Sequence, residues 1–361
     1  MKIICTGISC SGRKELMHDF QSLCEEKGLK IGFFNVGDFM KKAAAEAGVE
    51  FTEKVLDSDT AVLALARKSA FYEITRLTQN HEHAFIGIHA CFRWRGVLLE
   101  GLPFRDILNL PADVFINVVD NLEDIAKRMS KNPQWSGMHR DEINVWIDEE
   151  DFLTKQLANF SGKPYYIVTR NHNLQNFYDL LFSQKKKLYL SYPITLLRET
   201  PEKIERIRTV GARLAKSFIV FDPLDIKDME LLANLEKSDS DAKIGDIDKG
   251  MFASLTDDFA LRIESIKTRT ISRDYQFIRQ SDFIVVIYPT DKLSPGVLSE
   301  MNFASRYNKP VYAVYTHARS IFFENLCEQI FDSTEDMEQF LIENYAAEPI
   351  SNAKGNLENI T

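Results

Sequence analysis

The stretch Phe283 to Ala304 reads FIVVIYPTDKLSPGVLSEMNFA. Its apolar start, Phe283 to Tyr288, has the length of one strand and no polar alternation, which is typical of a strand buried on both faces of a parallel sheet. Pro295 and Gly296 then form a turn that opens a helix. Since a buried strand followed by a turn and a helix is the repeating unit of α/β folds, this stretch predicts the fold class.

The same alternation extends over most of the chain. The Lys triplet that ends at Lys187 interrupts it, and we predict two domains, 1–183 and 187–345, each a mainly parallel sheet flanked by helices. Residues 225–257 are rich in Asp, Lys and Ser and predict an inserted segment, and 346–361 predict a disordered tail. Strand-like runs occur at Lys2 to Thr6, Lys30 to Asn35, Ala84 to His89, Asp113 to Val119, Pro164 to Val168, Leu188 to Ser191, Ser217 to Phe221, Phe283 to Tyr288 and Pro310 to Tyr315.

Composition narrows the function classes. The 361 residues are 45% hydrophobic, yet the longest apolar runs are strand-sized, so no membrane span and no signal peptide are expected. Five scattered cysteines predict reduced thiols and a cytoplasmic protein. A net charge of -9 argues against a nucleic-acid partner. His81 and His83 are expected in a solvated loop, without the further ligands of a zinc site.

The first strand-like run leads into GISCSGRK, residues 7–14, which we call the phosphate loop. Its two glycines have the spacing of a P-loop, in which backbone amides and a helix N-terminus bind phosphate. Arg13 stands where a Lys contacts the terminal phosphates, and Lys14 where a hydroxyl holds magnesium. These changes favour nucleotide binding without efficient phosphoryl transfer, with an active kinase or a structural loop as alternatives. The expected ligand-binding residues are Gly7, Ser9, Gly12, Arg13 and Lys14.

Residues 2 to 180 resemble archaeal-type adenylate kinases and related nucleoside monophosphate kinases. Besides the loop, the resemblance rests on NVGDFM at 35–40, IHA at 88–90 and GLP at 101–103. It implies that Asp38 and the region of His89 line the monophosphate side, and that Arg128 and Arg140 contact phosphates. It also implies ATP or another nucleotide as ligand, with or without magnesium.

In the C-terminal half, Glu300 lies in the first turns of the helix that follows a buried strand. Open α/β sheets bind ligands at the carboxyl ends of their strands, so Glu300 is expected to face a ligand. The alternative is an ordinary surface Glu favoured by the helix dipole. By the same strand-end rule, Asp222 is expected near a base or sugar.

Four segments in this half, LYLS at 188–191, RDYQFIRQSDF at 273–283, SPGVLSE at 294–300 and KPV at 309–311, occur in an order that resembles the nucleoside 2-deoxyribosyltransferase superfamily. That superfamily includes the deoxynucleoside 5′-monophosphate N-glycosidases, and the resemblance covers about 130 residues. It implies that Tyr189 orients a nucleophilic Glu300, that Asp274 is the acid/base, and that Ser294 and Gly296 bind ligand. It further implies a homo-oligomer and no cofactor for glycosidic cleavage.

The turn after the first strand of this half departs from the family pattern. It reads YPIT at 192–195, in place of a Gly-Ser-Ile-Arg turn that holds a 5′-phosphate in the monophosphate glycosidases. Pro193 is still expected at the substrate site. Ser294 remains available for a 5′-phosphate, and Arg198 or Arg273 is the candidate to replace the missing Arg. Asp282 precedes a buried strand, where an Asp is usually a structural residue.

These features lead to a main hypothesis of an N-glycosidase or deoxyribosyltransferase that cleaves a nucleoside or nucleotide, joined to a kinase-like domain that binds or senses a nucleotide. One variant is an NAD glycohydrolase effector in phage defence. A second hypothesis is a bifunctional salvage enzyme with an active kinase. A third is a regulator that binds nucleotides at both sites without catalysis.

Overall fold

The computed structural model describes residues 1–226 and 249–346. The predicted disordered tail from residue 347 onward lies outside these residues, as does the 227–248 part of the predicted insertion. Over the described part of the chain, no helix is both long enough and apolar enough to cross a membrane. The chain is α/β, with parallel sheets flanked by helices, which confirms the predicted fold class at this level.

The chain divides into two compact units. The first unit comprises Met1–Leu174 and Leu224–Gln276, and the second comprises Gln175–Pro223 and Phe277–Thr361. The division passes through one helix, α10 (Lys249–Gln280). The predicted domain boundary between 183 and 187 therefore stays a prediction.

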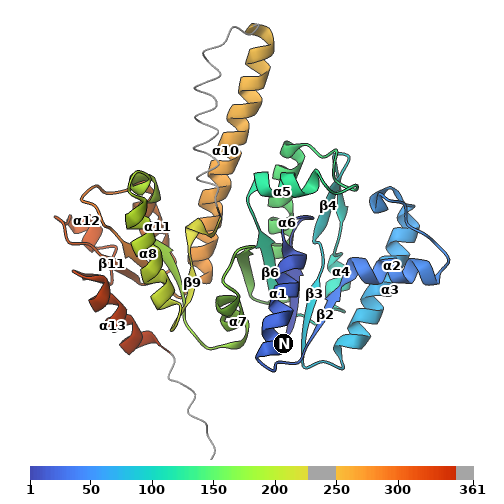
Figure 1. Ribbon diagram of the computed structural model, residues 1–361, viewed down its shortest axis with the longest axis horizontal. Coiled ribbons are helices and arrows are strands. Elements are labelled where there is room, and N and C mark those ends of the chain that lie inside the picture. Colours follow the sequence, from blue (N-terminus) through green and yellow to red (C-terminus); the bar gives the residue numbers. More distant parts are fainter. Residues whose placement is uncertain (227–248, 347–361) are drawn as a thin grey trace, which may run out of the picture. The chain divides into compact units, whose positions relative to one another are not determined.

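The first unit is built on a five-stranded sheet in the order β2-β3-β1-β6-β7, in which all neighbours are parallel (Figure 1). All five strand-like runs predicted in this half form strands of the sheet. β1 lies at the centre with four of its five residues buried, as expected for a strand covered on both faces. The strands are β1 (Lys2–Thr6), β2 (Ile31–Asn35), β3 (His83–Gly87), β6 (Val114–Val119) and β7 (Tyr165–Thr169).

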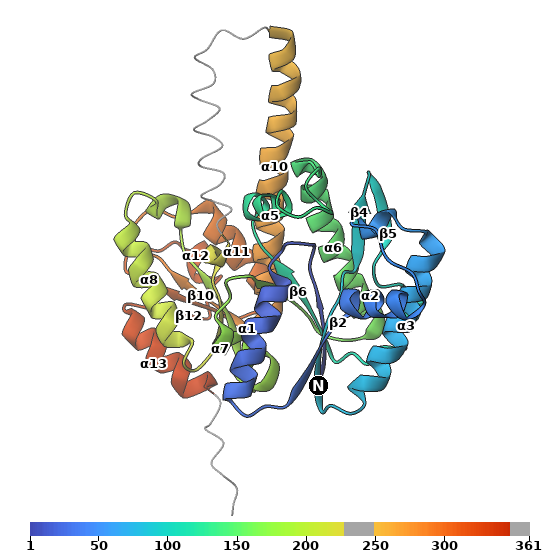
Figure 2. The same cartoon turned by 45° about the vertical axis from the view of Figure 1, so that its right-hand side comes forward.

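Helices cover both faces of this sheet (Figure 2). On one face, Phe20 of α1 packs on Phe33 and Phe85. On the other face, Ile4 and Ile86 belong to a core shared with α3 and α6. The helices of the first unit are α1 (Arg13–Glu26), α2 (Val36–Glu46), η1 (Val55–Asp57), α3 (Thr60–Thr78), α4 (Phe104–Ile107), α5 (Leu122–Met129), α6 (Arg140–Ser161) and the larger part of α10.

An antiparallel hairpin was not predicted from the sequence. It joins β4 (Cys91–Trp94) to β5 (Val97–Glu100) after β3. Its two-residue turn has positive φ at both positions, 52° at Arg95 and 77° at Gly96. A tight hairpin turn of this kind requires φ > 0 twice, and Gly at the second position makes that possible.

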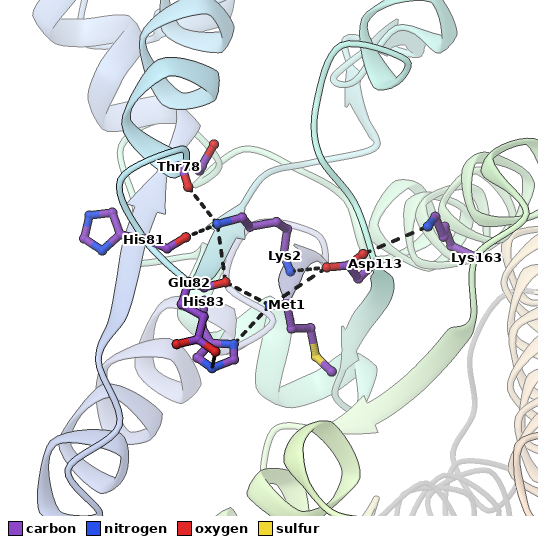
Figure 3. A network of polar contacts seen from close by, with 8 residues as sticks. All are labelled: Met1, Lys2, Thr78, His81, Glu82, His83, Asp113 and Lys163. Carbon is purple, nitrogen blue, oxygen red and sulfur yellow. Dashed lines mark hydrogen bonds and ion pairs between the residues drawn. The ribbon is translucent and has the colours of Figure 1, made fainter. Parts of the chain in front are cut away.

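Polar contacts hold the amino-terminal ends of neighbouring strands together (Figure 3). The Lys2 ammonium donates to the carbonyl oxygens of Thr78, at 2.7 Å, and His81. The Lys2 amide donates to Asp113 Oδ2 at 2.7 Å. His83, expected in a solvated loop, is instead the first residue of β3. The phosphate loop follows the carboxyl end of β1, and His89 follows the carboxyl end of β3. Both therefore lie at the other end of the strands from these contacts.

The second unit has its own five-stranded parallel sheet, in the order β12-β11-β10-β8-β9. The four strand-like runs predicted in this half form strands, and β12 was missed. The elements are α7 (Leu174–Phe182), β8 (Lys187–Ser191), η2 (Ile194–Leu197), α8 (Pro201–Leu214), β9 (Ile219–Phe221), η3 (Pro223–Asp225), the end of α10, β10 (Phe283–Ile287), α11 (Pro295–Arg306), β11 (Val311–Val314), α12 (Ile321–Glu324), β12 (Gln329–Phe331) and α13 (Thr334–Tyr345).

Candidate functional site

The strand order of the second unit contains a switch point. From β8 the chain moves outward to β9, then returns to the other side of β8 to form β10, and continues outward through β11 and β12. At the carboxyl ends of two neighbouring strands whose connections diverge in this way, open α/β sheets leave a crevice for ligands. Here those strands are β8 and β10, and α11 begins soon after β10.

The carboxylate of Glu300 is held at this switch point by two hydroxyl groups. Tyr189 Oη donates to Glu300 Oε1 at 3.0 Å, and Ser191 Oγ donates to Oε2 at 2.5 Å. Tyr189 and Ser191 are two residues apart on β8, so both point to the same face of the sheet. Both are fully buried. The expected contact between Tyr189 and Glu300 is therefore present, and Ser191 is an additional donor that sequence reasoning missed.

The turn before α11 is fixed by Tyr288. Its hydroxyl accepts from Ser294 N at 2.9 Å and donates to Ser294 O at 3.2 Å. Burial, more than the nearby charge of Glu300, raises the pKa of Tyr288 to about 12, so the phenol is neutral at ordinary pH. Ser294 is the N-cap of α11, but its hydroxyl does not cap the helix. A Cβ on Gly296 would meet only Ser294 Oγ, at 3.7 Å, so packing does not require Gly there.

Asp222 follows β9 and is held by side chains of the same unit. Tyr192 Oη donates to Asp222 Oδ1 at 2.7 Å, and Arg208 Nε lies 3.6 Å from Oδ2. Pro193 precedes the short helix η2. The structure thus gives Asp222 a structural environment, and its expected contact with a base or sugar stays a prediction.

The two remaining Asp residues of this half differ in position. Asp274 is part of α10 in the first unit, where Arg273 Nη2 lies 3.4 Å from its Oδ1, and its pairing with Glu300 stays a prediction. Asp282 Oδ2 accepts from the Lys187 amide at 2.8 Å and lies 3.2 Å from Lys187 Nζ. That contact joins the starts of β8 and β10, as expected of a structural residue.

In the first unit, two residues of the phosphate loop have left-handed backbone conformations. Cys10 and Gly12 have positive φ values of 63° and 91°. Turns that contain such residues are common where backbone amides bind anions. A Cβ on Gly7 would come within 2.7 Å of Val118 O, so the first Gly of the loop is required by close packing.

A buried carboxylate, that of Glu150 in α6, is hydrogen-bonded to the backbone of the phosphate loop. Glu150 accepts from the amides of Gly7 at 3.0 Å, Ala90 at 2.9 Å and Cys91 at 2.9 Å. It connects the phosphate loop to the segment after β3. Burial raises the pKa of Glu150, and the three amide hydrogen bonds act in the opposite direction. Sequence reasoning missed Glu150, although it lies four residues after Trp146 on the apolar side of α6, where a Glu is unusual.

Arg13 is buried beside the loop, at 5% exposure. Its Nη2 lies 3.2 Å from His89 Nε2, and since a guanidinium can only donate, this imidazole nitrogen accepts. Burial and the charge of Arg13 hold the pKa of His89 well below its usual range, so the imidazole is neutral. Arg13 Nε and Nη1 have no hydrogen-bond partner among the described residues.

The other cations expected to bind phosphate are engaged by carboxylates. Arg128 donates to Asp120 Oδ2 at 2.5 Å and to Cys10 O at 2.7 Å. Arg140 Nε donates to both oxygens of Glu123, at 2.9 and 3.1 Å. Lys14 and Asp38, both largely exposed, lie 3.7 Å apart.

A cavity of about 510 Å³ opens beside the phosphate loop. That volume lies within the roughly 300–1,000 Å³ of small-molecule sites. Ser9, Gly12, Arg13 and Lys14 line it, together with Asp38 and other residues that follow β2 and β3. Gly7, Arg128 and Arg140, which sequence reasoning placed with them, are not among its lining residues.

No known protein family matches this chain, and no curated protein matches it in sequence. The two resemblances seen in the sequence therefore stay expectations. Function is inferred from the geometry of the two sites.

Proposed function

We propose that the chain is an N-glycosidase or deoxyribosyltransferase that cleaves the N-glycosidic bond of a nucleoside or nucleotide, with Glu300 as nucleophile. The observation that supports this proposal is the pair of hydrogen bonds from Tyr189 and Ser191 to the two oxygens of Glu300 at the switch point of the second unit. A surface Glu placed only by the helix dipole would need no such donors.

The proposed reaction has two steps. A Glu300 oxygen attacks the anomeric carbon, the bond from that carbon to the base nitrogen breaks, and the base leaves with the bonding electrons. A general acid, the role that the resemblance implies for Asp274, gives the proton that the departing base needs. Water, or a second base, then attacks the anomeric carbon of the glycosyl ester, gives its proton to the conjugate base of that general acid, and frees Glu300.

The two hydroxyl groups act on this reaction by positioning the nucleophile. A carboxylate with one donor on each oxygen is restricted to a single orientation, which lowers the entropic cost of reaching the attacking geometry. Because β8 supplies both donors from fully buried positions, their own rotamers are fixed by packing. The reaction itself requires no cofactor.

We propose in addition that the first unit binds a nucleotide at the phosphate loop and does not transfer phosphoryl groups efficiently. The turn conformation, the buried Arg13 and the adjoining cavity support binding. Lys14 at the position of the magnesium-binding hydroxyl argues against efficient transfer. A cytoplasmic homo-oligomer that acts on small molecules remains our expectation. Salvage kinase activity and a purely regulatory role are the alternatives.

The test measures, by chromatography, how much free base is released from deoxynucleosides, from their 5′-monophosphates and from NAD. The full chain is compared with Glu300→Ala and with Glu335→Ala, which removes an exposed Glu of the same unit. We expect release by the unchanged chain and by Glu335→Ala, and none by Glu300→Ala. Release from NAD alone would select the glycohydrolase variant. If no substrate loses its base, the glycosidase proposal is wrong.

A second measurement tests the covalent step. A 2′-fluoro-arabinonucleoside carries an electron-withdrawing group that slows hydrolysis of the glycosyl ester, so the ester should accumulate. Mass spectrometry of peptides should then find the added sugar on Glu300. A label on another residue would reject Glu300 as nucleophile while leaving glycosidase activity possible.

A further inference from the structure

We propose that Phe277 is a positioning residue for the nucleophile, because it holds the ring of Tyr189 in the orientation from which its hydroxyl donates to Glu300. This inference rests on the proposed glycosidase function of the second unit and names a further residue on which that function depends. It is carried by three aromatic rings of that unit that lie against one another, by their burial, and by the different lengths of the two side chains that hold Glu300.

Phe277, in the last turn of α10, packs on two neighbouring strands of the second sheet. Its ring centroid lies 6.3 Å from that of Tyr189, with the ring planes 26° apart. It lies 5.6 Å from that of Phe221, with the planes 12° apart. Tyr189 of β8 and Phe221 of β9 are partners in the register of the sheet, so their side chains lie on the same face. One Phe277 ring therefore packs against both strand residues.

Burial makes this arrangement of rings restrictive. The exposed fraction is 0% for Tyr189 and 1% for Phe221 and for Phe277. In a close-packed interior, a ring cannot turn unless its neighbours move as well. The χ2 torsion of an isolated Tyr side chain is broad, whereas stacked neighbours favour one plane for the ring. Phe277 therefore narrows the range of orientations that the Tyr189 ring can adopt.

The two donors to Glu300 depend on such packing to different degrees. Ser191 Oγ is bonded directly to Cβ, so the backbone of β8 and a single torsion determine its position. Tyr189 Oη lies at the far end of a ring, where a small rotation displaces it most. Its distance of 3.0 Å from Glu300 Oε1 is at the long end of the usual range of about 2.5–3.0 Å, so a further displacement weakens the bond. The contribution of Tyr189 should therefore depend on Phe277, and that of Ser191 should not.

The first test is a set of double-mutant comparisons of base release by the full chain. Phe277→Leu removes the stacked ring and keeps an apolar side chain. We expect it to lower kcat by roughly threefold to tenfold with little change in KM, because the hydroxyl is displaced but still present. In the Tyr189→Phe background, where there is no hydroxyl to position, the same change should lower kcat by less than about twofold. In the Ser191→Ala background, the full reduction should remain.

Phe218→Leu is the matched control, because Phe218 is as buried as Phe277, belongs to the same unit and packs its ring on Phe283. It should lower the stability of the chain to a similar extent and change kcat by less than about twofold. An equal fall in kcat with Phe218→Leu, or an undiminished effect of Phe277→Leu in the Tyr189→Phe background, would overturn the proposal and make Phe277 an ordinary core residue. If Phe277→Leu does not fold, Phe277→Met, which is closer in volume, replaces it.

A fluorine NMR measurement separates this proposal from the glycosidase function. Replacement of Tyr189 by 3-fluorotyrosine places a fluorine next to the hydroxyl, and the resonance is recorded with and without Glu300→Gln. The ring current of Phe277 is present in both spectra, so their difference reports the contact with Glu300. Phe277→Leu should reduce that difference by about half or more, and Phe218→Leu should not.

The two measurements together distinguish the possible failures. If the fluorine result is as expected but no substrate loses its base, the glycosidase proposal is wrong, while Phe277 still positions Tyr189 against Glu300. If base is released and Phe277→Leu changes neither kcat nor the fluorine difference, the positioning role is wrong and the glycosidase proposal stands. If no base is released and the fluorine difference is unchanged, both are wrong.

Discussion

The two units place opposite charges at the same topological position. In the second unit, an acidic side chain, Glu300, lies at the carboxyl ends of parallel strands and is held by neutral hydroxyl groups. In the first unit, a basic side chain, Arg13, lies beyond the carboxyl end of β1 and is held by a neutral imidazole. Each of the two charged side chains thus accepts or donates hydrogen bonds to neutral groups that fix its orientation. We infer that one is suited to attack an electrophilic carbon and the other to bind an anion.

The largest expected effect tests the acidic side of this comparison. Glu300→Ala should lower the rate of base release by about a thousandfold or more, because removal of a covalent nucleophile leaves only binding and weak background catalysis. The measurement is the initial rate under saturating substrate. A loss of less than about tenfold would mean that Glu300 is not the nucleophile. The two units would then differ in the charge of these side chains, but not in the function that we infer from it.

The next effect tests the support of the basic site. Glu150→Ala should lower the free energy of unfolding by about 3 kcal/mol, because three buried amides lose their acceptor. The change in the free energy of unfolding is measured by chemical denaturation of the full chain, monitored by the fluorescence of its three Trp residues, all of which belong to the first unit. Glu26→Ala, at an exposed position on α1, is the control and should change stability by less than about 0.5 kcal/mol. Similar values for both variants would contradict the proposed support.

The variant Tyr189→Phe tests whether the hydroxyl of Tyr189 orients the nucleophile. The variant keeps the ring that stacks on Phe277 and removes only the hydroxyl that donates to Glu300. We expect kcat to fall by roughly tenfold to a hundredfold, as for loss of one positioned hydrogen bond, with little change in KM. A change confined to KM would instead place Tyr189 in substrate binding.

The smallest effect concerns pH and the imidazole that holds Arg13. The pKa of His89 is lowered in the folded chain, so the unfolded chain takes up a proton first as pH falls below about 6.5. The contribution of His89 to stability is therefore complete above this pH and decreases below it, by up to about 1.4 kcal/mol per pH unit. Unfolding of the wild type and of His89→Gln is compared between pH 7.5 and pH 5.5. Parallel pH profiles would show that His89 does not stay neutral.

The sequence predicted the strands well because their signal is local. Runs such as Phe283 to Tyr288 are apolar throughout, and each formed a parallel strand. The hairpin at Arg95 and Gly96 was missed because each of its strands is only four residues long, which is too short for a clear pattern. β12 was missed for the same reason, as it has three residues and one of them is buried.

The candidate sites were predictable only where one element determined the contact. Ser191 could have been found from Tyr189, since residues two apart on a strand share a face. Glu150 could have been suspected from its place on the apolar side of α6. No sequence pattern could show that Arg13 would contact His89, because that pair depends on the register of β1 against β3.

The contact between Gly7 and Glu150 has a consequence for synthesis of the chain. The two residues are 143 positions apart in the sequence, so the loop that leaves the ribosome first receives its support only when α6 has followed. Closing so long a connection has an entropic cost that local contacts in the first forty residues cannot offset. A nascent chain that ends before α6 would therefore carry all residues of the phosphate loop without the carboxylate that accepts the Gly7 amide.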